Sequence, residues 1–265
     1  MSGGEIIVTM MAAAAALFGW VRWYWLLSRI TPLAVRPGLR QALAVAPIIL
    51  CFGLIAILLF YSSDDVKSSR IYMFMYTVLG MGWLAGLTIL MPLFGLSMRD
   101  DVLERGNAAA APAIVGLMAG WMLGFAGGNI GDGPGWWVVI FCAGLSCGSL
   151  LISWIILHLI AHINDTITIE RDAAAGWRFG GFMAASGLIL GRAVAGDWTS
   201  AGATLRDFSE IAWPVIILLA LELSVEWIFR PRGDRRPGSA FAGGVTPAVF
   251  YMGAAMVWLI AVGWW

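Results

Sequence analysis

Long apolar runs alternate with short polar segments along the whole chain, a pattern typical of a protein that crosses a membrane many times. A helix needs about 20 consecutive apolar residues to cross roughly 30 Å of hydrocarbon. Runs of this kind cover residues 5–27, 41–61, 71–97, 108–127, 136–163, 173–195, 211–229 and 245–265. The sequence therefore predicts an all-α membrane protein with about eight transmembrane helices, which form a single transmembrane domain over residues 1–265.

A short motif of charged residues, a polar residue and several alanines opens two of these runs. Its first copy contains Glu104, Arg105 and Asn107 before Gly116-Leu117-Met118-Ala119; its second contains Glu170, Arg171 and Asp172 before Gly181-Phe182-Met183-Ala184. The two copies lie 65 to 66 residues apart. With weaker echoes at residues 40–42 and 238–240, this spacing predicts four helical hairpins, at approximately 1–65, 66–130, 131–196 and 197–265. Because each hairpin crosses the membrane twice, successive copies are expected to be parallel repeats.

The motif supports two interpretations. Asn107 and Asp172 stand where a side chain can cap the first amide groups of a helix, and the alanines after them suit close helix packing. Alternatively, these helix starts form a cytoplasmic site for an anion or a lipid headgroup. In both interpretations we expect Ala108–Ala111 and Ala173–Gly176 to face protein rather than lipid.

These segments, together with Ser28-Arg29-Ile30-Thr31-Pro32, resemble the YjfL type of bacterial inner-membrane protein, a family whose domain has no assigned function. In that family an Asn followed by small residues opens the second helix of each hairpin. The resemblance is strongest over residues 98–196 and weakest after 237, where Gly238 replaces the polar cap. It implies a multi-pass protein of the bacterial inner membrane, here as two such units in tandem, and brings no substrate, cofactor or catalytic residue.

The charge distribution predicts an orientation. The chain has sixteen basic and sixteen acidic residues, so nothing favours nucleic acid as a partner. Counting Lys and Arg by side places eleven near the loops after the first, third, fifth and seventh helices and four on the other side. The eleven are Arg29, Arg36, Arg40, Arg99, Arg105, Arg171, Arg178, Arg230, Arg232, Arg235 and Arg236. Positive loops stay cytoplasmic, so both termini are predicted on the non-cytoplasmic side.

Four ionisable residues near the ends of two predicted helices are the main candidates for chemistry. His158 and His162 end the fifth helix, and Glu222 and Glu226 end the seventh. In each pair the spacing of four places both side chains on one helix face. If the two helices adjoin, the four could form a polar cluster that relays protons or binds an ion or a transition metal. Alternatively they reach interfacial water, with Glu222 paired to a nearby Arg.

A second polar group is expected at the opposite membrane boundary. Arg192 lies close enough to that boundary to snorkel, and Asp132 or Asp197 could pair with it. The glycine-rich segment 127–135 lacks the phosphate-binding motifs and is predicted to be a tight turn. No catalytic triad or catalytic carboxylate pair is visible at interpretable spacing, and the chain has only two His residues, so the sequence disfavours an enzyme.

Three functional classes follow from these features. The first is movement of a small ion or solute, or maintenance of the envelope, with His158, His162, Glu222 and Glu226 as the polar cluster. The second is a structural or assembly subunit that anchors a protein partner or a second copy in the bilayer. The third is a membrane metal or haem protein that depends on the His pair. The sequence leaves the cofactor open.

Overall fold

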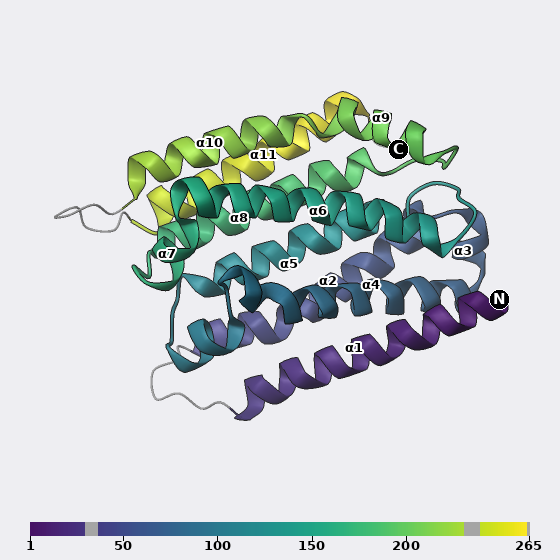
Figure 1. The fold of residues 1–265 in the computed structure, drawn as a ribbon, viewed down its shortest axis with the longest axis horizontal. Helices are drawn as coiled ribbons and strands as arrows, with labels where there is room; N and C mark the ends of the chain where they lie inside the picture. The colour runs from purple at the N-terminus through teal and green to yellow at the C-terminus, as the bar shows by residue number, and fades with distance from the viewer. Residues whose placement is uncertain (30–36, 231–238, 264–265) are drawn as a thin grey trace.

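The protein is an all-α bundle whose long helices lie side by side along one axis (Figure 1). A computed structural model describes residues 1–29, 37–230 and 239–263. Several residues used above lie outside these ranges. They are Ile30, Thr31, Pro32 and Gly238 of the family resemblance, and Arg36, Arg232, Arg235 and Arg236 of the orientation count.

The helical elements follow one another through short connections. Their bounds are α1 Gly3–Arg29, α2 Pro37–Tyr61, α3 Asp64–Ser68, α4 Arg70–Leu90, the 3-10 turn η1 Met91–Phe94, the π-helical turn η2 Met98–Glu104, α5 Ala110–Gly127, α6 Trp136–Ala161, α7 Ile163–Thr168, α8 Ala173–Ala193, α9 Ala201–Ala212, α10 Pro214–Phe229, the π-helical turn η3 Phe241–Val245 and α11 Thr246–Val262.

Within the described ranges, six helices are long and apolar enough to cross a membrane: α1, α2, α4 with η1, α5, α6, and α11 with η3. A seventh span is formed if α9 and α10, which meet at a bend of 44°, are taken together. The chain is therefore a multi-pass membrane protein by helix length and hydropathy. The predicted helix over 211–229 agrees with α10, whereas the short amphipathic helix α9 before it was not predicted.

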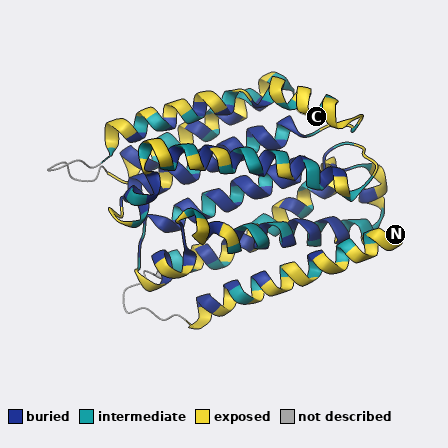
Figure 2. Ribbon diagram, in the orientation of Figure 1, coloured by how far each residue is buried: buried dark blue, intermediate teal, exposed yellow. Residues whose placement is uncertain are grey.

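The remaining predicted span, residues 173–195, is present as the helix α8. It is not among the six or seven helices that are apolar enough to cross a membrane. It carries Arg178 and Arg192 and many small residues, which lower its hydropathy. Most of α8 is nevertheless buried within the bundle, whereas α1 exposes much of its surface (Figure 2). A helix enclosed by other helices does not need an apolar surface for lipid, which explains why the hydropathy of α8 can be low.

The helices α5 and α8 approach each other closely because glycines line their contact. A Cβ atom added to Gly116 would lie 2.2 Å from the carbonyl oxygen of Gly180, and one added to Gly127 would lie 2.0 Å from that of Gly191. Both pairs are 64 residues apart, so the two helices run in the same direction. Ala109–Ala111 and Ala174–Gly176 are buried, as predicted for the small residues that open these helices.

Two further helix pairs run in the same direction and also pack through small residues. In the α1–α4 pair, Gly82 lies against the backbone of Ala12 and Gly19 against Ala85. In the α8–α11 pair, Gly181 lies against Ala248. Close contacts between residues about one predicted hairpin apart therefore recur in three places along the bundle.

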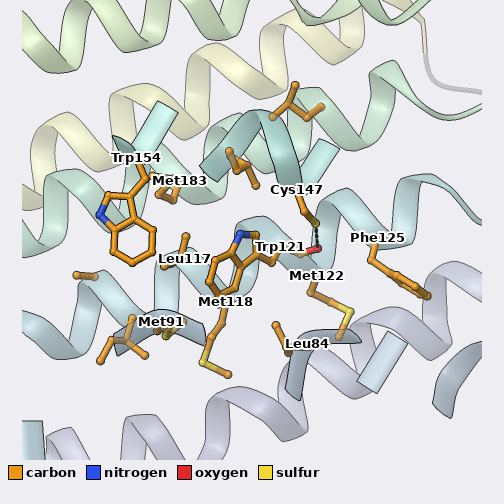
Figure 3. Packing of buried hydrophobic residues seen from close by; sticks show 14 of the residues in the cluster. Leu84, Met91, Leu117, Met118, Trp121, Met122, Phe125, Cys147, Trp154 and Met183 are labelled. Carbon is orange, nitrogen blue, oxygen red and sulfur yellow. Dashed lines mark hydrogen bonds between the residues drawn. The ribbon is translucent and has the colours of Figure 1, made fainter. Parts of the chain in front are cut away.

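The core lies where α4, α5, α6 and α8 meet, and it is rich in aromatic and sulfur-containing side chains (Figure 3). Trp154 is the largest fully buried side chain; its ring packs 5.8 Å from that of Phe179 and its indole N–H donates to Asn164 at 2.8 Å. Cys147 donates to the carbonyl of Trp121 at 3.5 Å. This packing holds α8 in place, and α8 supplies the central residue of the site described next.

A candidate functional site around Arg178

A fully buried arginine, Arg178, lies at the centre of a polar group between α8, α10 and α11. Its guanidinium is 0% exposed. Nε donates a hydrogen bond to Oε1 of Glu226 at 2.7 Å, and Nη1 donates to the carbonyl of Gly243 at 2.5 Å. Nη2 lies 2.7 Å from the same Glu226 oxygen without hydrogen-bond geometry, and 3.7 Å from Oδ2 of Asp172. The ring of Phe229 covers the group, with its centroid 5.9 Å away.

The two glutamates of α10 face the interior of the bundle, one turn apart. Glu222 and Glu226 are both 0% exposed. The hydroxyl of Tyr251, on α11, donates to Oε2 of Glu222 at 2.7 Å. The prediction that the spacing of four places both carboxyls on one helix face is confirmed. The arginine expected to pair with Glu222 pairs with Glu226 instead, and Glu222 is hydrogen-bonded to Tyr251.

The orientation count treats Arg178 as a loop residue, and this assignment is wrong. The residue lies within α8 and is enclosed by protein, so it says nothing about which loops face the cytoplasm. Arg178 is the sixth residue of the predicted helix 173–195. A charged residue within a transmembrane helix calls for a partner in the bundle, so this position was the sequence feature that could have identified Arg178 as a site residue.

The structure does not bring the two histidines to the two glutamates. The helices α6 and α10 do adjoin, and Arg230, just after α10, donates to the carbonyl of Ala161 at 3.4 Å. His158 instead lines a hollow of about 370 Å³ with residues of η1 and α7. The side chain of His162 is 55% exposed, with Nδ1 3.8 Å from Asp165. In the described part of the chain, no three His, Cys, Asp or Glu side chains are grouped so as to hold a metal ion.

The repeat motif near the start of α8 contributes one member to the site. Asp172 caps α8, as predicted: its Oδ1 accepts from the N–H of Ala174 at 2.9 Å. Asn107 accepts a similar bond from the N–H of Ala109 at 3.0 Å and donates to the carbonyl of Ile167 at 2.7 Å. The prediction that Asn107 is the N-cap is wrong, however, because α5 begins at Ala110 and Ala109 holds the cap position. Asp172 and Asn107 are both buried, but only Asp172 lies beside a basic residue of the helix that follows it, because α5 contains no Lys or Arg to match Arg178 of α8.

The charged members of the motif lie at the surface instead. Glu104 pairs with Arg99 at 2.8 Å. Arg105 lies 3.4 Å from Asp101, and Glu170 lies 3.4 Å from Arg230. Arg171 is exposed and has a left-handed backbone conformation, with φ 55°. These four residues therefore surround the helix starts without entering the buried network.

At the opposite end of the bundle, the expected ion pair takes a different form. The carboxylate of Asp197 accepts from the backbone N–H of Asp132 at 2.8 Å, which joins two loops. Nε of Arg192 donates to the carbonyl of Gly263, after α11, at 3.1 Å. Asp132 and Asp197 are thus neighbours, while the described hydrogen bond of Arg192 goes to a backbone oxygen.

Several polar atoms of the central network have no hydrogen-bond partner among the described residues: Asp172 Oδ2, Glu222 Oε1 and Glu226 Oε2. If all three carboxyls were ionised, the single charge of Arg178 would leave two negative charges uncompensated among buried side chains. Such charges are expensive inside a membrane protein unless protons or cations neutralise them. The network is therefore able to take up positive charge.

Comparison of the chain with protein-family models, with curated proteins and with solved structures found no match. The resemblance to the YjfL type therefore stays a prediction.

Proposed function

We propose that this chain is a bacterial inner-membrane protein that moves protons, and that the carboxyls of Glu222 and Glu226 carry them. The observation behind the proposal is that Glu226 and Asp172 face one guanidinium, Glu222 is bonded only to the neutral Tyr251 hydroxyl among the described residues, and each of the three buried carboxyls keeps an unpartnered oxygen. If the network served only to stabilise the fold, we would expect these carboxyl oxygens to have hydrogen-bond partners, because an unsatisfied buried polar group costs about 1–3 kcal/mol. Ionisable groups of this kind inside a bundle are typical of proton relays.

A route to the network favours the same function. Glu226 and Arg230 line a hollow of about 470 Å³ between the ends of α6 and α10. This hollow reaches the end of the bundle at which Glu170 pairs with Arg230. Protons would reach Glu226 from this end and pass to Glu222, one turn deeper on the same face of α10, where the Tyr251 hydroxyl is the next polar group.

The proposal includes eight membrane crossings, with α8 as the additional one. The start of α1 and the end of α11 lie toward the same end of the bundle (Figure 1), which is consistent with an even number of crossings. The helix α8 runs alongside α5 in the same direction, and it is enclosed by other helices. The contacts between α1 and α4, α5 and α8, and α8 and α11 support four parallel hairpin repeats. The predicted orientation, with both termini non-cytoplasmic, remains part of the proposal.

The test is proton flux into liposomes that contain the purified protein. A potassium gradient with valinomycin provides the driving force, and a trapped pH-sensitive dye reports the flux. Glu222→Gln is the decisive variant, because its partner is the neutral Tyr251 hydroxyl and the charge of Arg178 stays paired with Glu226. Glu210→Gln on α9 is the matched control, since Glu210 is exposed and outside the network.

We expect flux above that of empty liposomes for the native protein and for Glu210→Gln, and loss of that flux for Glu222→Gln. Native protein that is folded but no more active than empty liposomes would overturn the proposal and leave a structural or anchoring role. Unchanged flux in Glu222→Gln would remove this carboxyl from the path.

A further inference from the structure

We propose that a hollow at the end of the bundle where α1 begins binds a small organic ammonium group. The hollow has a volume of about 270 Å³. It lies between the start of α1, the end of α2, the start of α4 and residues 128–135 of the glycine-rich segment 127–135, which is predicted above to be a tight turn. It is separate from the Arg178 network, and the proposal does not rest on proton movement.

The first observation is a buried acceptor without a donor. Asn129 lines the hollow, is 6% exposed, and uses its Nδ2 to donate to the carbonyl of Phe125 at 2.9 Å. That carbonyl fixes the orientation of the amide, because only the nitrogen can donate to it. Oδ1 is therefore an acceptor, and it has no partner among the described residues. A buried acceptor on a residue that lines a hollow can be satisfied by a donor that enters from outside the chain.

The second observation is the charge around the hollow. Glu5, Asp65 and Asp132 line it, and its lining includes no Lys, Arg or His. The carboxylates of Glu5 and Asp65 are partly used by local bonds, to the backbone N–H of Ser2 and of Val66. No described residue bonds to the carboxylate of Asp132. A donor that enters the hollow is therefore favoured if it carries positive charge.

The remaining walls are suited to an organic cation rather than a bare metal ion. Tyr72 and Tyr76 line the hollow, and aromatic side chains attract ammonium groups. Leu58, Val138 and Val194 add apolar surface for a short hydrocarbon chain. The ligand chemistry that fits is an alkylammonium of a few carbons, either as a free amine or as the ethanolamine headgroup of a lipid.

The wall of the hollow is held in place before any ligand binds. The N–H of Gly196 donates to the carbonyl of Ile130 at 2.9 Å, and the N–H of Trp198 donates to that of Asp132 at 2.7 Å. Gly131 between them has φ 97°, a conformation that other residues rarely adopt. A wall fixed by such bonds loses little freedom when it meets a ligand, which favours binding.

The test is isothermal titration calorimetry of the full-length protein in detergent with propylammonium chloride. Propan-1-ol is the uncharged ligand of matched size. Asn129→Ala removes the acceptor and Asp132→Asn removes the exposed charge. Asp64→Asn is the control, because Asp64 is one residue from Asp65 but does not line the hollow. Size-exclusion elution and near-UV circular dichroism check that each variant is folded.

We expect propylammonium to bind and propan-1-ol not to bind. Affinity should fall about tenfold or more in Asn129→Ala, fall in Asp132→Asn, and stay unchanged in Asp64→Asn. Absence of propylammonium binding, equal binding of propan-1-ol, or native affinity in both Asn129→Ala and Asp132→Asn would overturn the proposal.

Titrations in nanodiscs distinguish the two sources of the ammonium. If phosphatidylethanolamine discs weaken propylammonium binding relative to discs of a neutral galactolipid, whose headgroup carries no ammonium, the ethanolamine headgroup occupies the hollow. If the two lipids give equal affinities, the ligand is a free amine. Either result supports an ammonium site.

Discussion

Replacing Arg178 by Met should destabilise the protein strongly, because it leaves buried carboxyls without their cation. The guanidinium donates to Glu226 at 2.7 Å and to the carbonyl of Gly243 at 2.5 Å, and it lies 3.7 Å from Asp172, all with almost no exposure. Removing one partner of a buried ion pair costs about 3–5 kcal/mol. Loss of the donor to the Gly243 carbonyl acts in the same direction, so we expect a loss of at least about 3 kcal/mol.

The double variant Arg178→Met with Glu226→Leu separates charge from packing. Apolar replacement of both members of a buried ion pair is often nearly neutral. The double variant should therefore recover at least half of the stability lost in the single one. The assay is equilibrium unfolding in mixed detergent micelles, followed by far-UV circular dichroism, with the free energy of unfolding compared among the three proteins.

Two results would refute this reasoning. A single variant as stable as the native protein would mean that the carboxyls are neutral without help from Arg178. A double variant as unstable as the single one would mean that the arginine acts through its volume rather than its charge.

Two further predictions concern packing and pH. Gly116→Val should lower the free energy of unfolding by about 1–3 kcal/mol or more, because its Cβ would meet the Gly180 carbonyl at 2.2 Å; Gly144→Ala, which has open space around it, should change stability little in the same unfolding assay. Burial raises the pKa of Asp101, in η2 outside the spans, above its ordinary value near 3.8, although the N–H of Ser97 and the charge of Arg105 oppose the shift. When the pKa of a carboxyl is higher in the folded state than in the unfolded state, the protonated carboxyl stabilises the fold. This contribution is fully present at pH values below the unfolded-state pKa, and it is lost as the pH rises through the folded-state pKa. The stability of the native protein relative to Asp101→Asn should therefore fall as pH rises from about 4 towards neutrality, and a flat or rising difference in unfolding free energy would contradict the assignment.

The sequence by itself determined the class of the protein and much of its local structure. Run length and hydropathy predict membrane spans because the thickness of the hydrocarbon is fixed. The cap of α8 by Asp172 follows from residues adjacent in the chain, and so does the shared face of Glu222 and Glu226. Even the burial of the alanines at the start of α5 and α8 was predictable, since small residues in membrane helices serve helix contacts.

Only the tertiary structure decided which polar groups meet. A four-residue spacing fixes a helix face but not its direction, and α10 turns its glutamates towards Arg178 on α8 and Tyr251 on α11, while His158 of α6 faces η1 and α7. The hollow around Asn129 is likewise built from segments far apart in the chain. The physical reason is that hydrophobic periodicity and capping are local, whereas the partners of a buried charge depend on how several helices rotate and pack together.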